Sequence, residues 1–162
     1  MNGLIVADSG PIFSLACIKQ LHLLDVIFVN VLIPEAVWKE VTKDVHSDLY
    51  PDIYNFFKTK VRKIKSLNDL VLIMDEGESE AVILYKELFA DFLLIDDKKA
   101  RKVAEYFDLN CIGTLGLLIY AKENGHLSEL KTHFEVLLKN NRYYSISLLN
   151  NILGSSAEDN LL

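Results

Sequence analysis

Short apolar runs alternate along the chain with longer segments in which apolar residues recur every three to four positions. Short runs bounded by turn residues are typical of buried strands, and the longer period is typical of helices that turn one apolar face toward a sheet. The predicted strands cover residues 4–7, 31–33, 61–64, 92–95 and 110–112. This alternation favours an α/β layered domain with a mainly parallel central sheet.

Helix-start signals follow several of these strands. Ser9-Gly10-Pro11 comes after the first strand, Pro34-Glu35 after the second, and Gly113-Thr114 after the last. Proline and small polar residues are common where a helix begins. Further helices are predicted over residues 81–88, 100–107, 127–138 and 147–153. A polar loop at 42–52 is expected to lead into one more helix, which ends near residue 58. We expect one domain over residues 1–154 and a flexible tail at 155–162, because the tail has no apolar period.

Composition narrows the class of protein. The chain has 162 residues, of which 51% are hydrophobic, enough for one sizeable core. A formal charge of −6 argues against a protein whose whole surface binds nucleic acid, although a local basic edge is compatible with it. Cys17 and Cys111 lack CxxC spacing, which favours free thiols and a cytoplasmic location. No signal peptide and no apolar stretch of the roughly 20 residues that span a membrane is recognisable.

Acidic residues gather where predicted strands end. Asp8 directly follows the first apolar run, and Asp96-Asp97 follow the fourth. Ligands of open parallel sheets bind at the carboxyl ends of the strands, so these side chains are expected at one rim. Acids on two predicted helices can reach the same crevice. The full set of candidates is Asp8, Glu40, Glu78, Glu80, Asp96 and Asp97.

Four or more carboxylates in one crevice repel one another unless a cation lies among them. Hard oxygen ligands suit Mg²⁺ or Mn²⁺, and such ions support cleavage of phosphodiester bonds. Each acid also has a structural interpretation. Acids at a helix start commonly cap the helix, Asp8 can cap the helix that begins near Pro11, and Glu40 by itself fits an ordinary helix surface.

Five segments, taken in order, resemble the motifs of PIN-domain proteins. They are VADSGPIFSLA (6–16), IPEAVWKEV (33–41), DEGESEAVIL (75–84), LLIDDKKARKVAEYFDL (93–109) and IGTLGLLIYAKENG (112–125). The chain is most similar to an uncharacterised prokaryotic branch of predicted nucleic-acid-binding proteins related to VapC-type toxins. The resemblance covers roughly residues 4–153. It implies a PIN-like α/β/α sandwich and an endoribonuclease that cleaves single-stranded RNA with Mg²⁺ or Mn²⁺.

The resemblance also implies roles for individual acids. The first acid of the family matches Asp8, the second Glu40, the third Glu80 before Ala81 with Glu78 as a competitor, and the fourth Asp96 or Asp97. A glutamate at the third position departs from the aspartate common in the family and is one methylene longer. The expected catalytic residues are Asp8, Glu40, Glu80 and Asp97. The expected metal ligands are Asp8, Glu78, Glu80, Asp96 and Asp97.

Binding of RNA is expected beside the last pair of acids. Lys98, Lys99 and Arg101 follow Asp96-Asp97 directly and can hold phosphates, although such a run also fits a solvated helix face. Thr114 matches a hydroxyl residue of the family that caps a helix or bonds a ligand water. The family further implies a toxin–antitoxin pair with a small antitoxin protein as partner, and a homodimer.

Two other classes with aspartates at strand ends do not fit. A signalling receiver domain has its paired acids early and a lysine after the last strand, whereas here the pair comes late and no lysine follows Cys111-Ile112. A haloacid-dehalogenase-type phosphatase needs Asp-x-Asp at the first strand, where this chain has Asp8-Ser9-Gly10. The remaining alternative is a PIN-like module that binds RNA or protein without catalysis.

Overall fold

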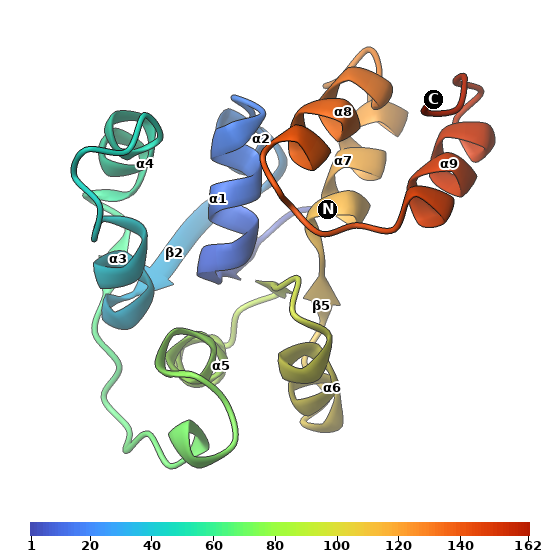
Figure 1. Ribbon diagram of the computed structural model, residues 1–162. Helices are drawn as coiled ribbons and strands as arrows, with labels where there is room; N and C mark the ends of the chain where they lie inside the picture. The colour runs from blue at the N-terminus through green and yellow to red at the C-terminus, as the bar shows by residue number, and fades with distance from the viewer.

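A five-stranded parallel sheet forms the centre of the molecule in the computed structural model, which describes all 162 residues (Figure 1). The strands lie in the order β3-β2-β1-β4-β5, and every neighbouring pair is parallel. Their bounds are β1 (Leu4–Ala7), β2 (Asn30–Pro34), β3 (Val61–Arg62), β4 (Phe92–Leu94) and β5 (Cys111–Ile112). The predicted α/β class and parallel sheet are confirmed.

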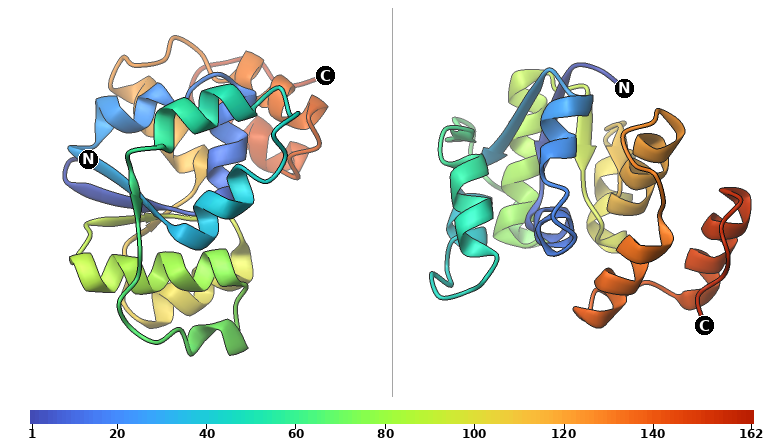
Figure 2. Two further views of the ribbon diagram at one scale, coloured as in Figure 1. Left: turned by 90° about the vertical axis from the view of Figure 1, so that its left-hand side faces the viewer. Right: turned by 90° about the horizontal axis from the view of Figure 1, so that it is seen from above.

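Helices cover both faces of this sheet. Figure 2 shows α5 and α6 on one face, with α1, α4 and α7 on the other. None of the helices is both long and apolar enough to cross a membrane. The helices are α1 (Ser9–Cys17), α2 (His22–Ile27), α3 (Glu35–Val41), α4 (Tyr50–Phe57), α5 (Glu76–Leu88), α6 (Lys98–Tyr106), α7 (Thr114–Glu123), α8 (Lys131–Lys139) and α9 (Ile146–Ser155), with a short 3₁₀ helix, η1 (Leu70–Leu72).

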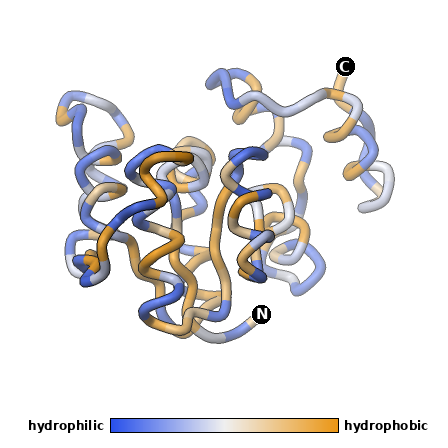
Figure 3. The backbone as a smooth tube through the Cα atoms, turned by 90° about the horizontal axis from the view of Figure 1, so that it is seen from below, coloured by the Kyte–Doolittle hydropathy of each residue, from blue (hydrophilic) through white to orange (hydrophobic).

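The core consists of two apolar layers, one on each face of the sheet. Successive side chains of a strand point to opposite faces. Ile5 and Ala7 of β1 therefore belong to the larger layer, which contains 28 buried residues and packs under α1, α4 and α7. Val6 belongs to the smaller layer under α5 and α6. The apolar stretches accordingly run through the middle of the molecule (Figure 3).

Strand order reverses between β1 and β4. The chain moves outward from β1 to β2 and β3 on one side, and from β4 to β5 on the other. Ala7 pairs with Leu94, and the backbone N–H of Asp8 donates to the Leu94 carbonyl at 2.9 Å. The residues that leave these two strands, including Asp8 and Asp96, thus flank the reversal, which is where open sheets bind ligands.

Several elements differ from the predicted ones, and α5 begins at Glu76, ahead of the predicted residue 81. Helix α2 was not predicted. Strand β3 ends at Arg62 rather than at Ile64, because its partner β2 ends at Pro34, which pairs with Arg62. Helix α8 begins at Lys131, four residues later than predicted.

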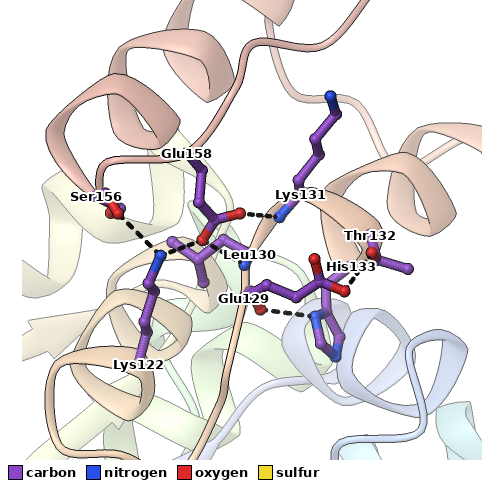
Figure 4. A network of polar contacts seen from close by, with 8 residues as sticks. All are labelled: Lys122, Glu129, Leu130, Lys131, Thr132, His133, Ser156 and Glu158. Atoms are coloured by element: carbon purple, nitrogen blue, oxygen red, sulfur yellow. Dashed lines mark hydrogen bonds and ion pairs between the residues drawn. The ribbon is translucent and has the colours of Figure 1, made fainter.

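The last residues contact the body of the domain through Glu158 (Figure 4). Its carboxylate accepts hydrogen bonds of 2.8 Å from the backbone N–H groups of Leu130 and Lys131, where α8 begins, and pairs with the ammonium of Lys122 on α7. Lys122 also donates to the Ser156 carbonyl at 2.9 Å. The predicted tail of residues 155–162 therefore begins with residues that are tied to α7 and α8.

Candidate functional site

A hollow of about 730 Å³ lies where β1, β4 and β5 end. We call it the acidic hollow, because five carboxylates line it: Asp8, Asp75, Glu78, Asp96 and Asp97. Lys98 and Arg101 of α6 line it as well, together with residues 141–145 of the linker between α8 and α9. Four of the five carboxylates are sequence candidates.

Asp8 is the most deeply buried of these acids, with 5% of its surface exposed. It occupies the position before α1, yet its side chain caps no backbone N–H of that helix, and its Oδ1 atom is buried with no hydrogen-bond partner. Burial is the main cause that raises the pKa of Asp8 from 3.8 to about 7. The Ser9 backbone offsets part of this, and the nearby carboxylates Glu78, Asp75 and Glu40 add to it. The alternative in which Asp8 caps α1 is therefore wrong.

Glu78 faces the hollow from the first turn of α5. It forms a capping box with Asp75: its backbone N–H donates to Asp75 Oδ1 at 2.8 Å, and its carboxylate accepts from the Asp75 backbone N–H at 3.4 Å. Burial, followed by the charge of Asp75, raises the pKa of Glu78 from 4.5 to about 7, and the charges of Asp97 and Glu40 contribute further. Asp8 and Glu78 thus both sit in a field of like charge that a cation would relieve.

Asp96 and Asp97 have different environments although they are adjacent. Asp97 caps α6, because its Oδ1 accepts from the backbone N–H groups of Lys99 and Ala100 at 2.9 and 2.8 Å, which leaves Oδ2 without a protein partner. Both oxygens of Asp96 are bound: Thr114 donates to Oδ1 from its N–H at 2.7 Å and to Oδ2 from its hydroxyl at 2.6 Å. Asp97 therefore offers a free oxygen, and Asp96 is held rigidly.

The hydroxyl of Tyr144 also donates to Asp96 Oδ2, at 3.0 Å. Burial and the charge of Asp96 raise the pKa of Tyr144 to about 12, so the phenol stays protonated and remains a donor. Thr114, a predicted RNA contact, is fully buried and serves as the partner of Asp96. Gly113 precedes it without a side chain, because a Cβ there would lie 3.1 Å from Asp96 Oδ1.

The two remaining candidate acids lie at the margin of the acidic hollow or outside it. Glu40 does not line the hollow, but its Oε2 lies 3.1 Å from where a Cβ of Gly77 would be, next to the capping box of α5. Glu80 points elsewhere: its Oε2 accepts from the Ala36 backbone N–H at 2.9 Å, at the start of α3. The structure brings Glu78, and not Glu80, to the other acids.

The predicted basic residues divide between two neighbouring hollows. Lys98 and Arg101 line the acidic hollow, and Lys99 lines a smaller one that shares Asp75 and Glu78 with it. Arg101 pairs with Glu105 at 2.8 Å and donates to the Cys111 carbonyl at 3.3 Å. Part of its hydrogen-bonding capacity is thus used within the protein.

Sequence reasoning missed Asp75, Tyr144 and Arg142. The spacing Asp75-x-x-Glu78 before an apolar run is a capping-box signature that could have identified Asp75. Tyr144 and Arg142 lie on the α8–α9 linker (residues 140–145), the orange-red stretch between these helices in Figure 1. No sequence motif marks them, because the linker reaches the hollow only through the tertiary fold.

The end of α8 directs this linker. Asn141 has φ +57°, the backbone N–H of Arg142 donates to the Leu137 carbonyl, and that of Asn141 donates to the Leu138 carbonyl. This pair of bonds is a Schellman closure, which ends a helix and turns the chain away from its axis. Arg142 then donates from Nη2 to the Gly10 carbonyl at 2.8 Å and from Nε to Ser14 Oγ at 3.0 Å, so the linker is fastened to α1.

The ligand atoms that the acidic hollow offers suit a hard divalent cation that keeps part of its water shell. All are carboxylate oxygens, and Asp8 Oδ1 is a buried acceptor without a partner. No three His, Cys, Asp or Glu side chains stand close enough together to enclose an ion by themselves. Mg²⁺ commonly binds through one or two carboxylates and several waters, so an open set of this kind suits it better than a closed cage would. One or two of Asp8, Glu78 and Asp97 would hold it, and waters would complete its coordination shell.

The match to a family of known proteins covers nearly the whole chain. A family model described as a PIN domain matches residues 4–158, a range that includes every acid of the hollow. A similar solved structure is a domain of a functionally unknown protein from Methanocaldococcus jannaschii DSM 2661, with a TM-score of 0.43 and 14% identity, covering 68% of this chain and 90% of that one. No curated protein matches the chain.

Proposed function

The chain belongs to the PIN-domain family, whose members are generally nucleases, and from this premise we propose that it is an endoribonuclease that cleaves single-stranded RNA with Mg²⁺ or Mn²⁺. One observation carries the proposal. Asp8 holds a buried carboxylate oxygen without a partner at the point where strand order reverses, surrounded by further carboxylates. A group of this kind is costly to leave charged unless a cation compensates it.

The reaction would be hydrolysis of a phosphodiester bond. Water adds to the phosphorus, the bond from phosphorus to the leaving sugar oxygen breaks, and a proton from the water ends on that oxygen. A bound Mg²⁺ or Mn²⁺ supplies polarisation of the phosphate and an acidified water. No histidine lines the acidic hollow, so the carboxylates are the groups available to hold the ion and accept protons.

Each acid has a definite task in this proposal. Asp8 would hold the ion through its unpartnered Oδ1, and Asp97 would offer Oδ2 while its other oxygen caps α6. Glu78 approaches from α5. Asp96 takes part as a positioning residue, since Thr114 and Tyr144 fix its carboxylate beside Gly113.

Glu78 rather than Glu80 is the third acid in this proposal. Glu78 lines the hollow and its charge raises the pKa of Asp8, whereas the carboxylate of Glu80 binds the backbone of α3. Glu40 is assigned an outer role through its charge, because it lies beside Gly77 and outside the hollow.

Cleavage of an end-labelled single-stranded RNA by the purified protein tests the proposal. We expect cleavage with Mg²⁺ or Mn²⁺ and none with excess chelator. Asp8→Asn and Glu78→Gln should each lower the rate by about 100-fold or more, equivalent to about 3 kcal/mol of transition-state stabilisation. Glu80→Gln is the matched control, because a glutamine oxygen can still accept the Ala36 N–H, and its rate should stay near that of the wild type.

Cleavage that persists in Asp8→Asn or in chelator would contradict the metal-dependent mechanism. Loss of activity in Glu80→Gln with retention in Glu78→Gln would reverse the assignment of the third acid. A folded protein that binds RNA and never cleaves it would support the non-catalytic alternative. The antitoxin partner, the homodimer and the cytoplasmic location stay predictions from the family resemblance.

A further inference from the structure

The α8–α9 linker brings two side chains to the acidic hollow that the cleavage chemistry does not use. Arg142 and Tyr143 both line the hollow, although they lie about 46 residues beyond Asp96 along the chain. They differ in chemistry from the acids around them. One is a cation and the other an exposed aromatic ring.

Arg142 is anchored on one edge of its guanidinium and free on the other. Nε and Nη2 bind Ser14 Oγ and the Gly10 carbonyl, and Nη1 has no partner within the protein. No carboxylate pairs with it. A Cβ on Gly10 would lie 3.8 Å from Arg142 Nη2 and 3.9 Å from Asp8 Oδ2, so these two groups flank the same small space.

A fixed and unpaired guanidinium in a hollow lined by carboxylates is suited to a phosphate. Its planar donors match phosphate oxygens, and the two internal bonds hold it in one orientation, which reduces the entropy lost on binding. The chain as a whole has a charge of −6 and repels RNA, so a cation placed beside Asp8 has particular value there.

Tyr143 is almost completely exposed, with 96% of its surface accessible to solvent. The hollow beside it has an apolar portion formed by Leu115, Leu148 and Ile152. Aromatic side chains at such a rim stack on nucleobases, and this stacking contributes about 1–3 kcal/mol for each base. Bases within a duplex have both faces covered, so only an unpaired base can use the ring.

We propose that the α8–α9 linker is the RNA-binding arm of the site, in which Arg142 binds a backbone phosphate beside the acids and Tyr143 stacks on an unpaired base next to that phosphate. The inference rests on the proposed function only in taking RNA as the substrate. It assigns the preference for single strands to Tyr143 and the placement of the phosphate to Arg142.

Binding measured without metal tests the arm separately from catalysis. The affinity of a fluorescein-labelled single-stranded RNA is followed by anisotropy in chelator, over a series of salt concentrations. Loss of one phosphate contact to a single strand reduces the slope of log K against log salt by about 0.7. Arg142→Gln should weaken binding and reduce the slope by this amount, and Arg142→Lys should keep the slope.

Tyr143→Ala should weaken binding by roughly 5- to 150-fold, the equivalent of losing one stacked base, without a change of slope. Tyr143→Phe should bind like the wild type, because the ring is retained. A duplex of the same sequence should bind the wild type and Tyr143→Ala equally. These patterns separate a stacking ring from a charge contact.

Two control variants match the charge and the ring at positions away from the arm. Lys19 lies beyond the far end of α1 from Asp8, and Lys19→Gln should leave affinity and slope unchanged. Tyr106 is 83% exposed at the end of α6, and Tyr106→Ala should bind like the wild type. Melting curves verify that each variant is folded. If Arg142→Gln does not fold, the result for Tyr143→Ala decides the test.

Unchanged affinity and slope in folded Arg142→Gln, together with unchanged affinity in Tyr143→Ala, would overturn the inference. So would an equal loss in Tyr106→Ala. Failure of the proposed function gives a different result from failure of this inference. In that case the wild type binds RNA, the variants change the binding as described, and no cleavage follows when metal is added.

Discussion

Asp8 shows at the scale of one residue how a strand end comes to hold a buried carboxylate with a raised pKa. The apolar run Leu4–Ala7 lies inside the sheet, and the side chain that follows it is only 5% exposed. Burial penalises its charged form and raises its pKa from 3.8 to about 7. The protein thus keeps a carboxylate where charge is unfavourable, and function is the usual reason for such an arrangement.

Stability without metal should therefore fall as pH rises from about 4 to 7. Between these values the folded protein holds a proton on Asp8 that the unfolded chain has lost, so deprotonation favours unfolding. Glu78, whose pKa is raised from 4.5 to about 7, acts in the same direction. Asp8→Asn removes the contribution of Asp8 and should be more stable than the wild type at pH 8, by up to about 4 kcal/mol. Each kcal/mol corresponds to roughly 2–4 °C in melting temperature.

Thermal melting in chelator at pH 4, 6 and 8 measures this effect. The two proteins should nearly converge at pH 4, close to the unfolded pKa of 3.8, where Asp8 is protonated in the folded state and partly protonated in the unfolded chain. Mn²⁺ at 1,000 times its Kd should close this gap at pH 8, since it adds about 4.1 kcal/mol to the wild type alone. An Asp8→Asn variant that melts below the wild type in chelator at pH 8 would contradict the buried, uncompensated charge.

At the scale of an element, one acid can cap the start of a helix and also face the acidic hollow. Asp97 caps α6 with one oxygen and leaves the other free, and Asp75 and Glu78 close the first turn of α5 through their capping box. The structural and functional interpretations of an acid at a helix start are therefore compatible here. Capping fixes the backbone of the helix and thereby the direction of the free oxygen.

Two substitutions at Asp97 should separate these roles. Asp97→Ala removes the cap and should lower the free energy of unfolding by about 1 kcal/mol. Asp97→Asn keeps an accepting oxygen and should stay within about 0.5 kcal/mol of the wild type, because only the charge near the helix start is lost. Both should cleave RNA more slowly than the wild type. Denaturant melts and cleavage rates are the two measurements.

Retention of full activity in Asp97→Asn would remove Asp97 from the ligand set and leave it as a cap. Equal destabilisation by asparagine and alanine would show instead that the charge, and not the hydrogen bonds, stabilises the start of α6.

The C-terminal part of the chain completes the site at the scale of the whole molecule. Helix α8 packs in the core layer that includes α1, and its linker carries Arg142 and Tyr144 to the hollow. Glu158 accepts the first backbone N–H groups of α8 and pairs with Lys122 of α7, as Figure 4 shows. The last residues thus support the elements that hold the arm.

Glu158→Ala should lower the free energy of unfolding by about 2–3 kcal/mol, because two backbone N–H groups and one ammonium lose their acceptor. Asp159→Ala is the matched control, since Asp159 is exposed and forms no hydrogen bond. Burial would raise the pKa of Glu158, but the bonds from Lys122, Lys131 and Leu130 lower it below 4.5. Its contribution is present above about pH 4.5 and is lost as pH falls through the lowered pKa.

Melting temperatures of the two variants at pH 7 and pH 3 test this anchoring. Equal melting temperatures for Glu158→Ala and the wild type at pH 7 would mean that residues 155–162 are flexible, as the sequence predicts, and do not stabilise α8.

Local patterns were enough to predict the parallel sheet, the helices that follow β1, β2 and β5, and the places of Asp8 and Asp96-Asp97. Burial of a short apolar run and the residue at its end are properties of adjacent positions. Only the tertiary structure distinguished Glu78 from Glu80, because two residues along a helix turn its surface by about 200° and the packing of α5 selects the side that faces the acids. Arg142 and Tyr144 likewise depended on the fold, since they bind Gly10 and Asp96 across 132 and 48 residues of chain, and no local pattern encodes a contact created by the packing of α8.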